Sequence, residues 1–174
     1  MQQRLLKEHY LSLYHQAREK SAEWYVYRHA AALLGGTGNL IWIRDELKKE
    51  RAACLKYAER DGALPDTDYG TYGNYMRTKV RLYNEVIRDV LICYYETLAQ
   101  YADVHEDQST QLSLSLALLL KEYSPAQAST VIRHLALSYA FHSHNQRDQR
   151  QRKMLRKRAA IYAQVVLDLG GTLL

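Results

Sequence analysis

The residues whose types and spacing are best suited to chemistry form a basic segment near the end of the sequence. Positions 147–158 hold seven Lys and Arg side chains and one acid, giving a net charge of +6, whereas the whole chain carries +5. The seven cations are Arg147, Arg150, Arg152, Lys153, Arg156, Lys157 and Arg158. Cations clustered in this way attract polyanions, above all a nucleic-acid backbone, because binding releases the counterions condensed on the phosphates.

The periodicity of this stretch predicts an amphipathic helix that displays the cations. At about 100° per residue, apolar side chains share one face and most cations fan over the other, with Arg158 straying to the apolar side. The apolar residues are Leu155, Ala159, Tyr162, Val166 and Leu169. We therefore predict backbone contacts from six residues: Arg147, Arg150, Arg152, Lys153, Arg156 and Lys157. The alternative is a surface helix whose charges serve only solvation.

A second cationic row lies in the strongly periodic segment 74–103. Arg77, Arg81 and Arg88 follow one another at spacings of four and seven. In a helix they would span roughly 16 Å, the length of two or three phosphates of an extended strand. If both rows faced one backbone, they would guide a strand, and replacing this row by alanine would lower the salt dependence of binding. Simple solvation of the row is the alternative.

Residues suited to catalysis or metal binding lack the spacing that such chemistry requires. No Glu stands three positions before any of the seven histidines, which excludes a di-iron carboxylate bundle. Cys54 and Cys93 are isolated from each other and suit a hydrophobic core. The acidic patch 103–107 offers only one histidine as a metal ligand. His142 and His144 stand two positions apart and so point to different faces of a helix. We expect no catalytic residue, no metal and no cofactor, and hence no enzyme.

The glycine-rich stretch 35–38 is not predicted to bind phosphate. A phosphate-binding loop requires Lys and then Ser or Thr after its last glycine, but Gly38 precedes Asn39 and Leu40. A glycine that ends a helix is the better interpretation.

These residues must be positioned by helices. Periodicity predicts an all-α, single-domain bundle of about five or six helices over residues 1–174. The first, 5–34, is one long helix or two collinear ones with a weak point near Ser21. The others occupy 40–60, 74–103, 111–123, a segment that begins at Ser124-Pro125, and the basic helix up to Gly170-Gly171. Segment 63–73 is expected to be irregular, and the alternation in 111–123 leaves a strand conceivable there.

Composition bears on location and partners. The first ten residues lack the apolar core of a signal peptide and no apolar run could span a bilayer, so we expect a cytoplasmic protein without membrane contact. Fifteen tyrosines, against one phenylalanine, suit helical layers that contact neighbouring subunits, and stacking on unpaired bases is the alternative.

A short, helical, basic and tyrosine-rich chain without catalytic motifs resembles the small subunit of Cascade-type CRISPR surveillance complexes. The resemblance covers the whole chain in size, helix content and charge distribution. It implies a non-catalytic role in antiviral defence, in which several copies contact one another and the backbone subunits and guide a nucleic-acid duplex or displaced strand. The two cationic rows would carry that role.

Two other interpretations remain open. Residues 118–125, Leu-Leu-Leu-Lys-Glu-Tyr-Ser-Pro, with the later segment 161–166, are similar to helical segments attached to plasmid relaxases and primases, over about the last third of the chain. A structural module whose basic helix binds an acidic protein is the other possibility.

Overall fold

The structure, a computed structural model, describes residues 3–59, 63–64, 68–101 and 107–173. In this part of the chain seven helices and one short strand pair follow in the order α1 (Gln3–Gln16), α2 (Ala22–Gly35), α3 (Leu40–Tyr57), β1 (Ala63–Leu64), β2 (Gly70–Thr71), α4 (Tyr72–Tyr101), α5 (Asp107–Glu122), α6 (Pro125–Asn145) and α7 (Gln149–Asp168). The predicted all-α, single-domain fold is confirmed, with slightly more helices than expected.

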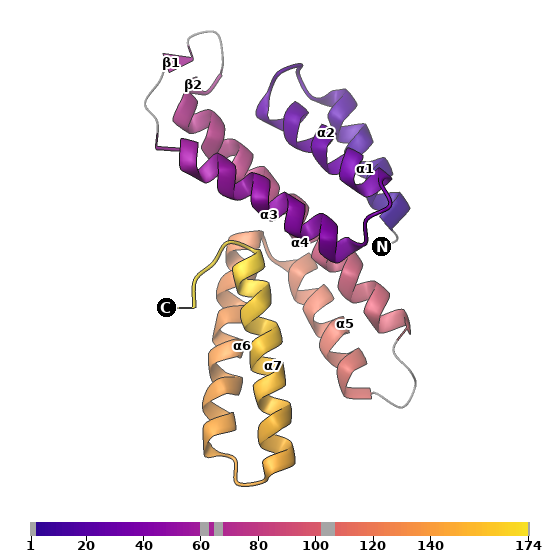
Figure 1. Cartoon of the computed structure of the whole chain (residues 1–174), viewed down its shortest axis with the longest axis vertical. Helices are drawn as coiled ribbons and strands as arrows, with labels where there is room; N and C mark the ends of the chain where they lie inside the picture. Colours follow the sequence, from indigo (N-terminus) through magenta and orange to yellow (C-terminus); the bar gives the residue numbers. More distant parts are fainter. Residues whose placement is uncertain (1–2, 60–62, 65–67, 102–106, 174) are drawn as a thin grey trace.

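The additional helix comes from the N-terminal segment, where the prediction of one long helix or two collinear helices was wrong. α1 and α2 lie side by side (Figure 1). The chain reverses because Lys20 adopts a left-handed conformation with φ of 63°, and Ser21 then caps α2 by accepting a hydrogen bond from the Trp24 amide at 3.1 Å.

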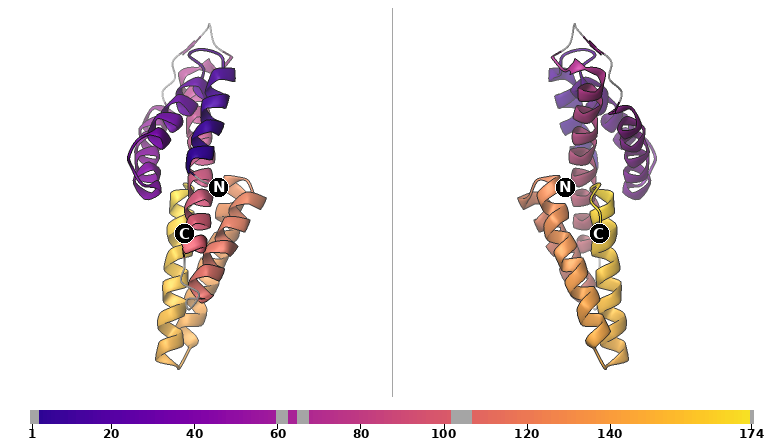
Figure 2. Two further views of the ribbon diagram at one scale, coloured as in Figure 1. Left: turned by 90° about the vertical axis from the view of Figure 1, so that its right-hand side faces the viewer. Right: turned by 90° about the vertical axis from the view of Figure 1, so that its left-hand side faces the viewer.

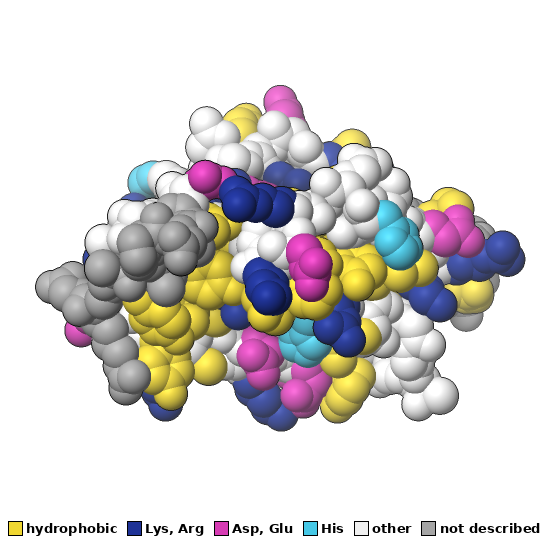
Figure 3. All heavy atoms as spheres, turned by 90° about the horizontal axis from the view of Figure 1, so that it is seen from above, with side chains coloured by type: hydrophobic (Ala, Val, Ile, Leu, Met, Phe, Trp, Pro, Cys, Tyr) yellow, Lys and Arg dark blue, Asp and Glu magenta, His cyan; other side chains and the backbone are white. Residues whose placement is uncertain are grey.

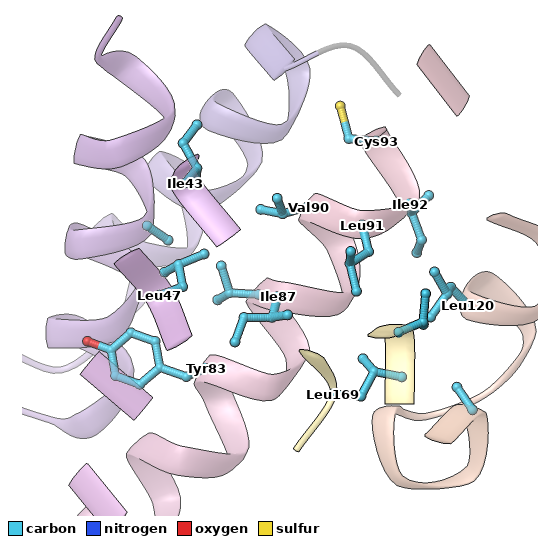
Figure 4. Close-up of a cluster of buried hydrophobic side chains, with 14 of the residues drawn as sticks. Ile43, Leu47, Tyr83, Ile87, Val90, Leu91, Ile92, Cys93, Leu120 and Leu169 are labelled. Carbon is cyan, nitrogen blue, oxygen red and sulfur yellow. The ribbon is translucent and has the colours of Figure 1, made fainter. Parts of the chain in front are cut away.

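α4 is the element on which most of the others pack. Its 30 residues correspond to a length of about 45 Å. Figure 4 shows Ile43 and Leu47 of α3 approaching Ile87 and Val90 from one side. On the other side, α5 contributes Leu120 and the end of α7 contributes Leu169, both buried.

The segment between α3 and α4 is only partly described. The short antiparallel strands pair Ala63 with Thr71 and Leu64 with Gly70, within the connection that the sequence predicted to be irregular. Residues 111–122 are helical within α5, which rules out the strand alternative.

α6 and α7 form an antiparallel hairpin that projects from the other helices. The hairpin tip forms one end of the longest axis of the molecule (Figures 1 and 2). α6 begins at Ser124-Pro125, as predicted, with a capping box in which Ser124 and Gln127 exchange hydrogen bonds. Among the helices of the described residues, none has the length and apolar character needed to cross a membrane.

Candidate nucleic-acid interface

The hairpin is held together by aromatic and small residues along its inner side. The rings of Tyr139 and Tyr162 are stacked, with centroids 5.4 Å apart and an interplanar angle of 14°. Further towards the tip, Ser143 is 1% exposed and its hydroxyl donates to the carbonyl of Ala140 at 2.7 Å. The predicted cation on the apolar side, Arg158, lies 5.8 Å from the centroid of the Tyr139 ring. This cation therefore packs within the hairpin.

The turn at the tip uses a second cation of the basic segment. The carboxylate of Asp148 caps α7 by accepting a hydrogen bond from the Gln151 amide at 2.9 Å. Arg152 folds back and donates from Nε and Nη2 to the carbonyl of Gln146, at 2.9 and 2.7 Å. Arg152 was predicted to contact phosphate, but here it joins α7 to the end of α6.

The other five predicted cations all reach the solvent. Arg147 lies in the turn, and Arg150, Lys153, Arg156 and Lys157 lie on α7, all of them exposed. Within the described residues, none of the five takes part in an ion pair or a side-chain hydrogen bond. From position 134 to 158 the only acid in the sequence is Asp148. We call these five residues the hairpin cations.

The three cations of the second predicted row all contact near neighbours on α4, and two of them pair with acids. Arg77 donates to Asn74 Oδ1 at 2.8 Å, and Arg81 pairs with Glu85 at 2.7 Å. Arg88, whose side chain is only 25% exposed, pairs with Asp89 at 2.9 Å. Asp89 also accepts a hydrogen bond from the hydroxyl of Tyr10.

The two rows do not come together. Arg77 and Arg81 lie in the first third of α4, at the end of the molecule opposite the hairpin tip (Figure 1). Figure 3 looks down on that end and shows acidic and basic side chains next to one another. The expectation that both rows follow one strand is therefore not met by this arrangement.

The base of the hairpin is fixed by a buried ionic cluster that the sequence analysis missed. The side chain of Asp168, 1% exposed, accepts from Lys48 Nζ at 2.5 Å, from Arg44 Nη1 at 3.2 Å and from Gln164 Nε2 at 2.8 Å. An isolated acid among the apolar residues 165–169 was the available signal, because a carboxylate on an apolar helix face must find cations or donors.

Arg51 completes this cluster from α3. Its Nη1 donates to the carbonyl of Asp168 at 2.6 Å and to Asn84 Oδ1 at 2.8 Å. It therefore gives a hydrogen-bond donor to a backbone carbonyl at the C-terminal end of α7. Burial lowers the pKa of the Arg51 guanidinium, and the negative charge of Asp168 opposes that shift. The cluster holds the hairpin to α3 and α4.

Other candidates for chemistry remain separate from one another. Cys54 and Cys93 are buried, and burial raises the pKa of both thiols. His142 and His144 are exposed near the end of α6, whereas residues 103–106 of the acidic patch lie outside the described residues. Across the described ranges, no three His, Cys, Asp or Glu side chains gather as a metal site would require. The stretch 35–38 ends α2 and leads into α3, as expected.

Comparison of the chain with protein-family models, curated proteins and solved structures found no match.

Proposed function

We propose that this protein binds nucleic acid through phosphate contacts made by the hairpin cations and performs no catalysis. The observation that carries the proposal is the presence of exposed cations without partners on a projecting hairpin, in a stretch (134–158) where Asp148 is the only acid. Side chains that are already paired must break an interaction before they bind phosphate. The hairpin cations carry no such cost, so counterion release from the nucleic acid contributes in full.

The test compares two variants with the same loss of charge. The first changes Arg150, Lys153, Arg156 and Lys157 to Gln, and the second changes Arg4, Arg18, Lys49 and Arg81 to Gln. The control cations are exposed but each pairs with a carboxylate. Each lost phosphate contact lowers the slope of log affinity against log salt by about 0.9 on a duplex.

We expect the hairpin variant to lose roughly three to four units of slope, as measured by fluorescence anisotropy at several salt concentrations. The control variant should keep a slope close to that of the unchanged protein. Equal losses in both variants would show attraction by net charge alone, and the proposed interface would be wrong.

We also propose that the protein acts as a non-catalytic subunit that contacts copies of itself or other subunits. Exposed apolar side chains on two helices support this part, since Leu118 of α5 is 64% exposed and Phe141 of α6 is 65% exposed. Sedimentation velocity over a range of concentrations tests it, and a sharp monomer at every concentration would count against self-association.

A further inference from the structure

The hairpin cations are arranged for two rows of phosphates, not for one. Successive positions on a helix differ by about 100°, so Arg150, Lys153 and Arg156 lie about 60° apart in turn around α7. Arg150 and Arg156 therefore point to opposite flanks of the exposed face, about 120° apart, with Lys153 midway. Lys157 falls on the flank of Arg150. A single strand offers one backbone, whereas a groove of a duplex has a backbone on each side.

The width of α7 and its packing against α6 suit such a groove. An α-helix with its side chains is about 10–12 Å wide, and the major groove of B-form DNA is about 12 Å wide. α6 packs on the opposite side of α7, so α7 can enter with its exposed face first. Between the flanks this face carries Ala160, which is exposed and small. The helix can therefore approach the groove floor closely.

The same face lacks the features that unpaired bases need. Single-stranded nucleic acid is bound largely by stacking of bases on aromatic side chains. Residues 149–161 contain no aromatic residue, and Tyr162 is 5% exposed because it stacks on Tyr139. Phe141 is exposed but lies about 180° around α6 from Ile132, which is buried on the inner side. Stacking therefore cannot accompany the phosphate contacts of α7.

We propose that the ligand is double-stranded DNA and that α7 lies in its major groove, with Arg156 contacting one backbone and Arg150 and Lys157 contacting the other. The proposal rests on the proposed function and deepens it. Duplex RNA is a poorer ligand, because its major groove is too narrow and deep for side chains to enter. The contacts are to phosphates, so base sequence should have little influence.

The first experiment compares the unchanged protein on three ligands of equal length: duplex DNA, single-stranded DNA and duplex RNA. Fluorescence anisotropy at one salt concentration should give at least tenfold tighter binding to duplex DNA. Equal or tighter binding to single strands or to duplex RNA would overturn the proposal. If the four-residue hairpin variant loses binding in that case, the proposed nucleic-acid function still stands. If the four-residue hairpin variant binds like the unchanged protein, the proposed nucleic-acid function itself is wrong.

The second experiment tests the two flanks and the face between them. Arg156→Gln and Lys157→Gln should each lower the salt slope on duplex DNA by about one unit, because each removes one phosphate contact. The two lost contacts lie on different backbones of the duplex. If either substitution leaves the slope unchanged, the groove arrangement is wrong.

Ala160→Tyr adds bulk without charge and should weaken duplex binding at least fivefold, while Ala52→Tyr, at an exposed position of α3, should leave it unchanged. Unchanged duplex binding of Ala160→Tyr would also overturn the proposal. Circular dichroism checks that both tyrosine variants keep their helices.

Discussion

At the scale of single residues, Asp168 joins α7 to α3 through several polar contacts. Its carboxylate lies 1% exposed between two cations of α3 and an amide of its own helix. Removing one member of a buried ionic cluster is costly, because the remaining charges lose their partner without regaining full hydration. Arg44 and Lys48 keep some contact with water, with side chains 16% and 26% exposed, which reduces that cost.

Asp168→Asn should therefore lower the free energy of unfolding by about 2–3 kcal/mol. Urea denaturation followed by circular dichroism measures this change. The matched control is Glu8→Gln, which breaks an exposed pair with Arg4 and should cost less than about 0.5 kcal/mol. Similar losses for both substitutions would mean that the Asp168 cluster does not stabilise the junction.

At the scale of elements, the end of α7 depends on how closely the chain passes α6. A Cβ atom added at Gly171 would lie 2.0 Å from Ser129 Oγ and 3.0 Å from Val166 Cγ1. Ser129 is buried, so neither neighbour can move aside without displacing the helices. At Gly38 an added Cβ would lie 2.0 Å from the Trp42 ring, but that ring is 45% exposed and can turn outward.

We expect Gly171→Ala to cost about 1–3 kcal/mol through overpacking, and Gly38→Ala to cost less than half as much. Thermal or urea unfolding of the two variants under identical conditions provides the measurement. The reverse order would show that the end of α7 is free to separate from α6.

Most of the helices could be predicted from the sequence, because apolar periodicity and caps such as Ser124-Pro125 are local signals. The reversal between α1 and α2 could not, since it depends on a left-handed lysine, Lys20, without a glycine or proline to mark it. Ion pairing within the Arg77 row could have been predicted, because Glu85 stands four positions after Arg81 and Asp89 stands directly after Arg88. The role of Arg152 was hidden, because it depends on where the turn places the carbonyl of Gln146.

At the scale of the whole molecule, stability is distributed unevenly along the longest axis. Between Tyr139 and Tyr162, Ser143 is the one buried residue, whereas α4 contributes eleven buried residues to the interior. Segments with few buried contacts open locally at a lower free energy than the rest of a protein. The part that carries the hairpin cations should therefore open more easily than the helices around α4.

Hydrogen exchange measured by mass spectrometry should show faster exchange for peptides from 140–160 than for peptides from 83–95. Addition of duplex DNA should slow exchange in the first region and leave the second unchanged. Uniform protection along both regions in the free protein would mean that the hairpin is as stable as the central helix.

The charges of α7 run against the electrical polarity of the helix. Aligned peptide dipoles give a helix a partial positive charge at its N-terminal end and a partial negative charge at its C-terminal end. α7 carries Arg150 and Lys153 near the positive end and Asp168 at the negative end, and each such placement costs about 0.3–1 kcal/mol at low ionic strength. Arg44 and Lys48 relieve the repulsion at the Asp168 end, and Asp148 relieves only part of it near the tip. A polyanion bound along the first turns would remove the remainder, so binding of such a ligand and helix formation in α7 would reinforce each other.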